Sequence, residues 1–329
     1  MSELHRFIIA RNWMKSNEDF LTTWHAHVGY KLDLFKCLEK SKSVEQVAKE
    51  CELNIALLER WVEVGIEVGH LKKGLAGKVK AKKKMVKYAS ADSPESVGIL
   101  LREMMELHIP TLLKYPELLK TNERLTYLED SFADIVAQTS TLLEKAAVPP
   151  ILRWIKKEKP TSIIDLGCGY GGYLNSIHTK FPKIELHGVE INTELAAKAN
   201  ENLGKDVTIS EGDMMEYIKN FQGKVDMVMA HNFLYYFPED KRMDLFRNIS
   251  NVMKKDGIVT FISPMMKAKY GQSFTSAFNA FMTAHENLYS LPTLDEIKEN
   301  GKRVGLTLKD AKPLIKEGGW YLVTMKKMK

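Results

Sequence analysis

The stretch Ile163-Ile164-Asp165-Leu166-Gly167-Cys168-Gly169-Tyr170-Gly171-Gly172 decides the fold of this chain. A short apolar run ends at a carboxylate and is followed by four glycines within six residues. Residues 173–178 then have helical spacing. A strand, a tight glycine turn and a helix N-terminus in this order form the place where parallel α/β sheets bind nucleotide-like cofactors. The glycines permit positive φ and let a ligand approach the backbone without meeting a Cβ atom.

The same glycines also satisfy a dinucleotide fingerprint, Gly167-x-Gly169-x-x-Gly172, and Glu190 follows at the spacing of a ribose-binding acid. Charge separates the two possible cofactors. A dinucleotide brings a pyrophosphate, which Asp165 would repel, whereas S-adenosylmethionine brings an ammonium and a sulfonium with a single carboxylate. Residues 165–177 contain one acid and no Lys or Arg. The sequence therefore favours S-adenosylmethionine over NAD.

Four further apolar segments predict the other strands of the sheet, at residues 184–190, 207–213, 225–232 and 257–263. The first ends in Glu190, whose carboxylate suits two ribose hydroxyls, and the second ends in Asp213, which suits the adenine amino group. With Asp165, an acid stands at the carboxyl end of three successive strands. Open α/β sheets bind their ligands at this edge.

This ordered set of glycines and acids makes residues 150–329 resemble a class I S-adenosylmethionine-dependent methyltransferase, with an α/β, Rossmann-like fold. The resemblance implies that the glycine loop holds the methionine end of the cofactor, Glu190 the ribose, and Asp213 with Met214 the adenine. The cofactor-binding residues expected in this way are Asp165, Gly167, Gly169, Gly171, Glu190, Ile191, Asp213, Met214 and Asn232.

Residues 1–90 have their own organisation. Apolar residues recur at helical spacing over 29–38 and 55–62, Ser43 opens a helix as its cap, and a β-wing is expected after Gly69. This order resembles the winged-helix N-terminal domain of dimeric small-molecule methyltransferases. The resemblance implies an all-helical, winged-helix-like dimerisation domain over 1–90, a helical connector over 91–149 that roofs the substrate pocket, and a homodimer.

A lysine-rich segment follows the second of these helices. Residues 72–87 hold eight lysines and no acid, in a chain whose net charge is +6. A basic wing is also typical of nucleic-acid binding, but no aromatic residue is interleaved before Tyr88. We interpret the segment as a solvated hairpin and expect no nucleic-acid partner. A nucleic-acid methyltransferase and a winged-helix regulator that senses S-adenosylmethionine remain as alternatives.

Residues 230–238, after the fourth strand, are expected to select the substrate. Many small-molecule O-methyltransferases carry a histidine at or near the position of Tyr235, and this departure argues against simple histidine-assisted O-methylation. The run from Asn232 to Tyr235 also lacks the two prolines typical of DNA amino-methyltransferases. We expect Tyr235, Tyr236 and Phe281 to contact a small aromatic or apolar metabolite, with an O, N or C acceptor.

His285 and His231 are the candidate catalytic bases. Methyl transfer from a sulfonium needs an acceptor lone pair in line with the methyl group and, for a protonated acceptor, a base. His285 lies after the fifth strand, where the family's substrate-facing helix is expected. The two histidines also leave open a metal-assisted C-methylation of a 2-oxo acid. Because no third ligand is obvious, no metal is expected.

The composition is that of a soluble protein with two domains. The 329 residues are 44% hydrophobic and 27% charged. The three cysteines form no pair motif, which favours a reducing, cytoplasmic location. Neither a signal peptide nor a membrane-spanning run is expected.

Overall fold

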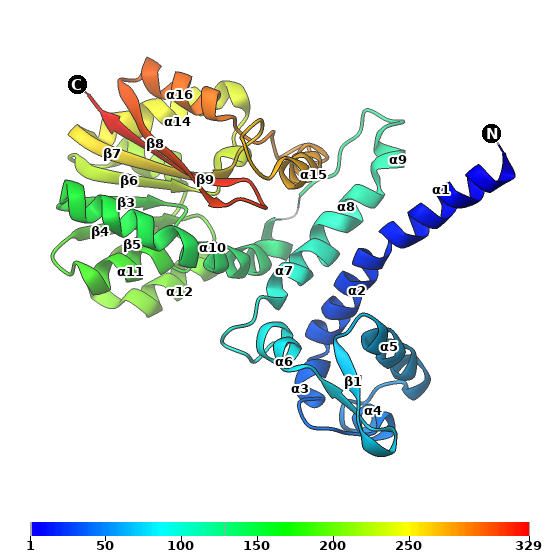
Figure 1. Cartoon of the computed structure of the whole chain (residues 1–329). Coiled ribbons are helices and arrows are strands. Elements are labelled where there is room, and N and C mark those ends of the chain that lie inside the picture. The colour runs from blue at the N-terminus through cyan, green and yellow to red at the C-terminus, as the bar shows by residue number, and fades with distance from the viewer. Residues whose placement is uncertain (1, 128, 329) are drawn as a thin grey trace. The chain divides into compact units, whose positions relative to one another are not determined.

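The computed structural model describes residues 2–127 and 129–328, which form two compact units that divide after Pro110 (Figure 1). The predicted boundary at 90/91 therefore lies inside the first unit, and the one at 149/150 lies inside the second. Among the described residues, no helix is both long and apolar enough to cross a bilayer.

The first unit consists of helices and one antiparallel hairpin, which pairs β1 (Leu71–Lys73) with β2 (Val79–Ala81). The hairpin means that the unit is not all-helical. The cap predicted at Ser43 is confirmed, because its hydroxyl accepts from the amide of Gln46 and the Gln46 side chain accepts from the amide of Ser43. The helical elements are α1 (Glu3–Ser16), α2 (Glu18–Lys31), α3 (Leu34–Cys37), α4 (Val44–Glu50), α5 (Ile55–Glu67), η1 (Leu75–Gly77), α6 (Lys83–Ala89), α7 (Gly98–Glu103) and η2 (Met104–His108).

The second unit is built on a seven-stranded sheet of order β5-β4-β3-β6-β7-β9-β8. The five strands predicted from the sequence are confirmed and are parallel to one another, and β9 runs antiparallel to both β7 and β8. The chain moves outward from β3 in one direction and then crosses to β6 on its other side, which places a crevice at the carboxyl end of β3. The strands are β3 (Ser162–Leu166), β4 (Glu185–Glu190), β5 (Thr208–Glu211), β6 (Val225–His231), β7 (Met253–Pro264), β8 (Leu306–Ile315) and β9 (Trp320–Lys327).

Helices cover both faces of this sheet (Figure 1). They are α10 (Glu129–Glu158), α11 (Gly172–Lys180), α12 (Thr193–Leu203), α13 (Met214–Asn220), η4 (Leu234–Tyr236), α14 (Glu239–Val252) and α16 (Leu294–Arg303). The unit also contains α9 (Tyr115–Leu118), η3 (Gly204–Asp206) and α15 (Gln272–Thr283), while α8 (Ile109–Leu113) spans the division between the units. A capping box between Thr293 and Glu296 starts α16.

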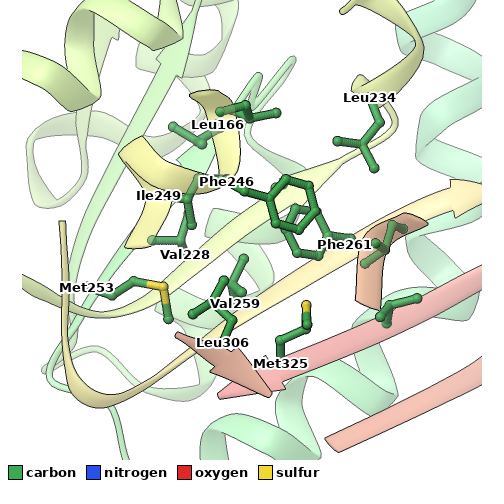
Figure 2. Packing of buried hydrophobic residues seen from close by; sticks show 14 of the residues in the cluster. Leu166, Val228, Leu234, Phe246, Ile249, Met253, Val259, Phe261, Leu306 and Met325 are labelled. Carbon is green, nitrogen blue, oxygen red and sulfur yellow. The ribbon is translucent and has the colours of Figure 1, made fainter. Parts of the chain in front are cut away.

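Neighbouring residues of each strand point to opposite faces, so each face has its own core. Ile164 and Val259 pack with Phe246 of α14. The rings of Phe246 and Phe261 stack with their centroids 4.8 Å apart, and Figure 2 shows both within this cluster. Ile163 packs in the second cluster, with residues of α10 and α11. A strand buried on both faces reads as a continuous apolar run, which is why 162–166 was recognisable.

Helix α10 continues through Pro149 and Pro150, although each proline removes a backbone donor. Ala147, Ile151 and Ile155 recur at helical spacing and are buried together against the sheet. Burial of this stripe offsets the missing hydrogen bonds. The two prolines, at which a boundary was expected, therefore lie within one helix.

Candidate functional site

The glycine loop connects β3 to α11 in a backbone conformation that favours glycine. Gly167, Gly169 and Gly171 have φ of +68°, +53° and +76°. A Cβ atom on Gly169 would meet no atom within 4 Å, so this part of the loop is open space. Gly171 differs, because a Cβ there would come within 2.5 Å of Leu203. The loop is thus shaped both to approach a ligand and to pack α11 against α12.

A cavity of about 350 Å³ opens beside this loop, at the carboxyl edge of the sheet. Most of the expected cofactor residues line it: Asp165, Gly167, Gly169, Glu190, Ile191, Asp213, Met214 and Asn232. Gly171 is not among the lining residues but precedes the first residue of α11. Of the expected catalytic and substrate residues, His231 and Tyr236 line the cavity, whereas His285, Tyr235 and Phe281 do not.

Glu190 is buried and holds the loop in place. Its Oε2 accepts from the amide of Gly169 at 2.9 Å, and its Oε1 accepts from the amide of Asn192 at 3.0 Å. The Asn192 side chain in turn caps α12 by accepting from the amide of Leu195. One carboxylate therefore connects the glycine loop to the end of β4.

Asp213 caps the next helix. Its Oδ1 accepts from the amides of Met215 and Glu216 at 2.8 and 3.0 Å, which starts α13 beside the cavity. The two hydrogen bonds accepted by Oδ1 fix the orientation of the Asp213 carboxylate at the helix N-terminus. Its neighbour Met214 lines the cavity across from Gly167.

The inner end of the cavity is acidic and contains unpartnered polar atoms. Asp165 is buried, and its Oδ2 has no hydrogen-bond partner among the residues that the structure describes. Burial together with Glu144 and Glu190 raises the pKa of this carboxyl. Burial raises the pKa of Glu144 to about 7. No Lys or Arg is among the described residues that line the cavity. A cationic ligand would satisfy these acids, so the residues present fit S-adenosylmethionine and not a pyrophosphate.

His231 reaches the cavity as a neutral side chain. Burial lowers its pKa to about 3. Its Nε2 lies 2.9 Å from the hydroxyl of Thr260, and its Nδ1 has no hydrogen-bond partner in the described part of the chain. The ring packs edge-on against Tyr173, with centroids 4.8 Å apart, and the Tyr173 hydroxyl is also without a partner.

His285 belongs to an aromatic cluster next to the cavity. Its ring contacts Phe281 and Tyr127, with centroids at 4.8 and 5.8 Å, and Tyr127 itself lines the cavity. Nδ1 of His285 donates to the carbonyl of Phe281 at 2.8 Å, which leaves Nε2 as the basic nitrogen of the neutral ring. Burial lowers the pKa of His285, and the positive charge of Lys114 lowers it further.

The same cluster contains the other expected substrate residues. Tyr235 packs edge-on against Phe278 at 5.9 Å, and Phe278 stacks on Phe281 at 6.0 Å. Trp320 of β9 contacts Phe278 at 6.0 Å. The structure thus brings Tyr235, Phe281 and His285 into one apolar cluster, and Tyr127 connects that cluster to the cavity.

The two histidines make separate contacts, His231 with Thr260 and His285 with Phe281. In the described part of the chain, no group of three or more His, Cys, Asp or Glu side chains is arranged to hold a metal ion.

Sequence reasoning missed Glu144 and Tyr173, and it favoured a core role over a substrate contact for Tyr127. Glu144 had a recognisable pattern, because it lies on the same helical face as Ser140, Ala147 and Ile151, a stripe that is otherwise apolar or small. An acid on the buried face of a helix is rarely a packing residue. Tyr127 lies in an irregular segment whose position depends on its pairing with residues 285–287.

Comparisons with known proteins agree with this geometry. Residues 163–257 match a family described as "Methyltransferase domain". A tRNA (guanine-N(7)-)-methyltransferase of Dictyostelium discoideum is 26% identical over 145 residues, which are 40% of this chain and 47% of the relative. The chain thus spans about half the length of the curated relatives that it matches.

Similar solved structures cover almost the whole chain. An O-methyltransferase family protein from Burkholderia thailandensis has a TM-score of 0.81 at 17% identity, over 97% of this chain and 98% of its own. Human N-acetylserotonin methyltransferase, solved with S-adenosylmethionine, has a TM-score of 0.77 at 14% identity, over 100% of this chain and 99% of its own. These similarities establish the fold.

Proposed function

We propose that this chain, an S-adenosylmethionine-dependent methyltransferase, transfers a methyl group to a small aromatic or apolar metabolite. The observation that carries the proposal is the cavity at the carboxyl edge of the sheet, which joins a glycine loop and buried acids to a neighbouring aromatic cluster. The similar solved proteins include small-molecule methyltransferases, such as the N-acetylserotonin enzyme.

The cofactor supplies an electrophilic methyl group on a sulfonium. We assign its methionine end to Asp165 and the loop of Gly167, Gly169 and Gly171. The ribose is assigned to Glu190 and Ile191. The remaining cofactor residues, which we assign to the adenine end, are Asp213, Met214 and Asn232. Since transfer from a sulfonium requires little beyond alignment, the main task of these residues is positioning.

The acceptor is assigned to the aromatic side of the cavity. Tyr236 lines the cavity directly, and Tyr235 and Phe281 support it through the aromatic cluster. Nε2 of His285 is the nitrogen able to take a proton from the acceptor. His231 is the weaker candidate, because a fully buried imidazole with a pKa of about 3 holds a proton poorly.

Titration calorimetry tests the cofactor. We expect S-adenosylhomocysteine to bind and NADH not to bind, because the cavity presents carboxylates and no phosphate-binding cation among its described lining residues. Tight binding of NADH would contradict the assignment. Methyl transfer to small aromatic compounds, followed with labelled S-adenosylmethionine, then tests the reaction.

A second candidate is methylation of an RNA base. The match to tRNA methyltransferases and the lysines of residues 72–87 favour it. Among these lysines, Lys72 and Lys73 lie in β1, and Lys83, Lys84 and Lys87 lie in α6. Salt-sensitive binding of tRNA and incorporation of label into tRNA would support this candidate over a metabolite.

We also propose that the first unit is a winged-helix dimerisation domain. Helix α1 has no buried residue, and it exposes Leu4, Phe7, Ile8, Ile9, Trp13 and Met14. So many large apolar side chains exposed on one helix are typical of an interaction surface. The free cysteines Cys37, Cys51 and Cys168 support the further proposal of a cytoplasmic location.

Light scattering tests the dimer. We expect twice the chain mass of 37.6 kDa at micromolar concentration, because dimerisation would bury the exposed apolar side chains of α1. Phe7→Asp with Trp13→Asp should give a monomer, whereas Lys49→Asp at an exposed position of α4 should not. A wild-type monomer would remove the proposal.

A further inference from the structure

We propose that Glu144 binds the primary ammonium group of the cofactor's methionine part, together with Asp165. This inference rests on the proposed function, since it names a further residue of the same cofactor site. Its evidence is the position of Glu144, which projects from α10 toward the first turn of α11, at the inner end of the cavity.

The carboxylate of Glu144 lies close to Gly172, the first residue of α11. A Cβ atom on Gly172 would lie 1.9 Å from Oε2 of Glu144 and 2.6 Å from its carboxyl carbon. The absence of a side chain at Gly172 therefore makes room for this carboxylate. Because α11 begins at Gly172, the carboxylate lies beside a helix N-terminus, whose dipole favours negative charge.

Polar atoms near this carboxylate lack hydrogen-bond partners among the described residues. Asp165 is 1% exposed and has an unpartnered Oδ2, and Tyr173 and His231, each 7% exposed, have an unpartnered hydroxyl and Nδ1. Three different elements, β3, α11 and β6, thus place atoms without partners among the described residues at this cavity. Buried polar atoms are normally hydrogen-bonded, so this arrangement points to a bound ligand.

Charge identifies the ligand's chemistry. Glu144 interacts electrostatically with Asp165 of β3 and Tyr173 of α11, and Asp165 interacts in turn with Glu190 of β4. Cys168 and His231 line the same cavity. All of them are acidic or, like His231, kept neutral by burial. A primary ammonium has three donors and one positive charge, which matches two carboxylates at this end of the cavity.

The position along the cofactor follows from the other assignments. With the ribose at Glu190 and the adenine at Asp213, the amino-acid end must lie on the opposite side, toward β3 and α11. Glu144 and Asp165 border that side of the cavity. An amine on the methyl acceptor would offer the same chemistry. Cofactor affinity and turnover, measured on one variant, distinguish the ammonium of the cofactor from that of an acceptor.

Glu144→Gln tests the inference by calorimetry with two ligands. S-adenosylhomocysteine carries the amino-acid part, and 5′-methylthioadenosine keeps the adenosine and the thioether without it. We expect the variant to bind S-adenosylhomocysteine about 10- to 100-fold more weakly, the range for one charge-assisted hydrogen bond, with methylthioadenosine unchanged. Glu201→Gln is the matched control, because Glu201 is exposed on α12 and is not among the lining residues.

Proton linkage provides a second readout. A carboxyl with a pKa of about 7 is half protonated at neutral pH and must ionise to bind an ammonium. Binding of S-adenosylhomocysteine therefore releases protons, and its affinity rises with pH through neutrality. The release, measured in buffers of different ionisation enthalpy, should decrease in Glu144→Gln, with Asp165 responsible for what remains.

The outcomes are distinct. An unchanged ratio of the two affinities in Glu144→Gln would overturn the inference, whether both ligands weaken equally or neither does. Unchanged cofactor affinity with lost turnover would assign Glu144 to an amine acceptor and overturn it as well. Failure of the wild type to bind S-adenosylhomocysteine would instead contradict the proposed function.

Discussion

His285→Ala is expected to lower turnover on the true substrate by about a hundredfold or more, the usual contribution of a general base. The structure supports this because Nδ1 donates to the carbonyl of Phe281, which orients the ring and leaves Nε2 basic. Steady-state kinetics with S-adenosylhomocysteine affinity measured in parallel checks it. Cofactor affinity should not change, since His285 is not among the residues that line the cofactor cavity.

The pH dependence gives a second measure of the same role. Burial and Lys114 lower the pKa of His285 below its ordinary value of 6.5. A base must be unprotonated, so activity should be complete at neutral pH and should fall only as the pH drops through the lowered pKa. His285→Ala should lose this acid limb of the profile.

A matched histidine separates the chemistry from general damage. His187 lies on β4, pairs with Glu185 at 3.0 Å and does not line the cavity. His187→Ala should therefore keep wild-type turnover. Full turnover in His285→Ala would mean that catalysis consists of positioning alone, which a sulfonium donor permits.

Glu190→Ala is expected to weaken cofactor binding by about 2–3 kcal/mol, or about 30- to 150-fold. Two effects act together. The variant loses the acceptor proposed for the ribose hydroxyls, and it releases the amides of Gly169 and Asn192, which Glu190 holds at 2.9 and 3.0 Å. Calorimetric titration with S-adenosylhomocysteine measures the change.

The control for Glu190 is Glu201→Ala, the same substitution at an exposed position on α12. It should bind the cofactor like the wild type. Thermal unfolding of Glu190→Ala reports whether release of the loop also affects the fold. A dissociation constant equal to that of the wild type would mean that the carboxylate serves only the loop and does not bind the ribose.

Much of the fold was predictable because its determinants are local in the sequence. Strands such as 162–166 are buried on both faces and read as apolar runs, and the caps at Ser43 and Thr293 follow a short pattern. Helix α10 continues through Pro149 and Pro150, because the burial of α10 against the sheet opposes the local preference of proline. Tertiary packing there outweighs propensity.

The sequence by itself determined the cofactor side of the site. Parallel strands deliver their carboxyl ends to one edge, so Asp165, Glu190 and Asp213 had to lie near one another once the strands were recognised. The tertiary structure alone decided the rest. Glu144, Tyr173 and Tyr127 come to the cavity from α10, α11 and an irregular segment. The helical pattern marks Glu144 as buried, but its position at the cavity depends on helix packing, and that of Tyr127 depends on pairing with Asn287, 160 residues away.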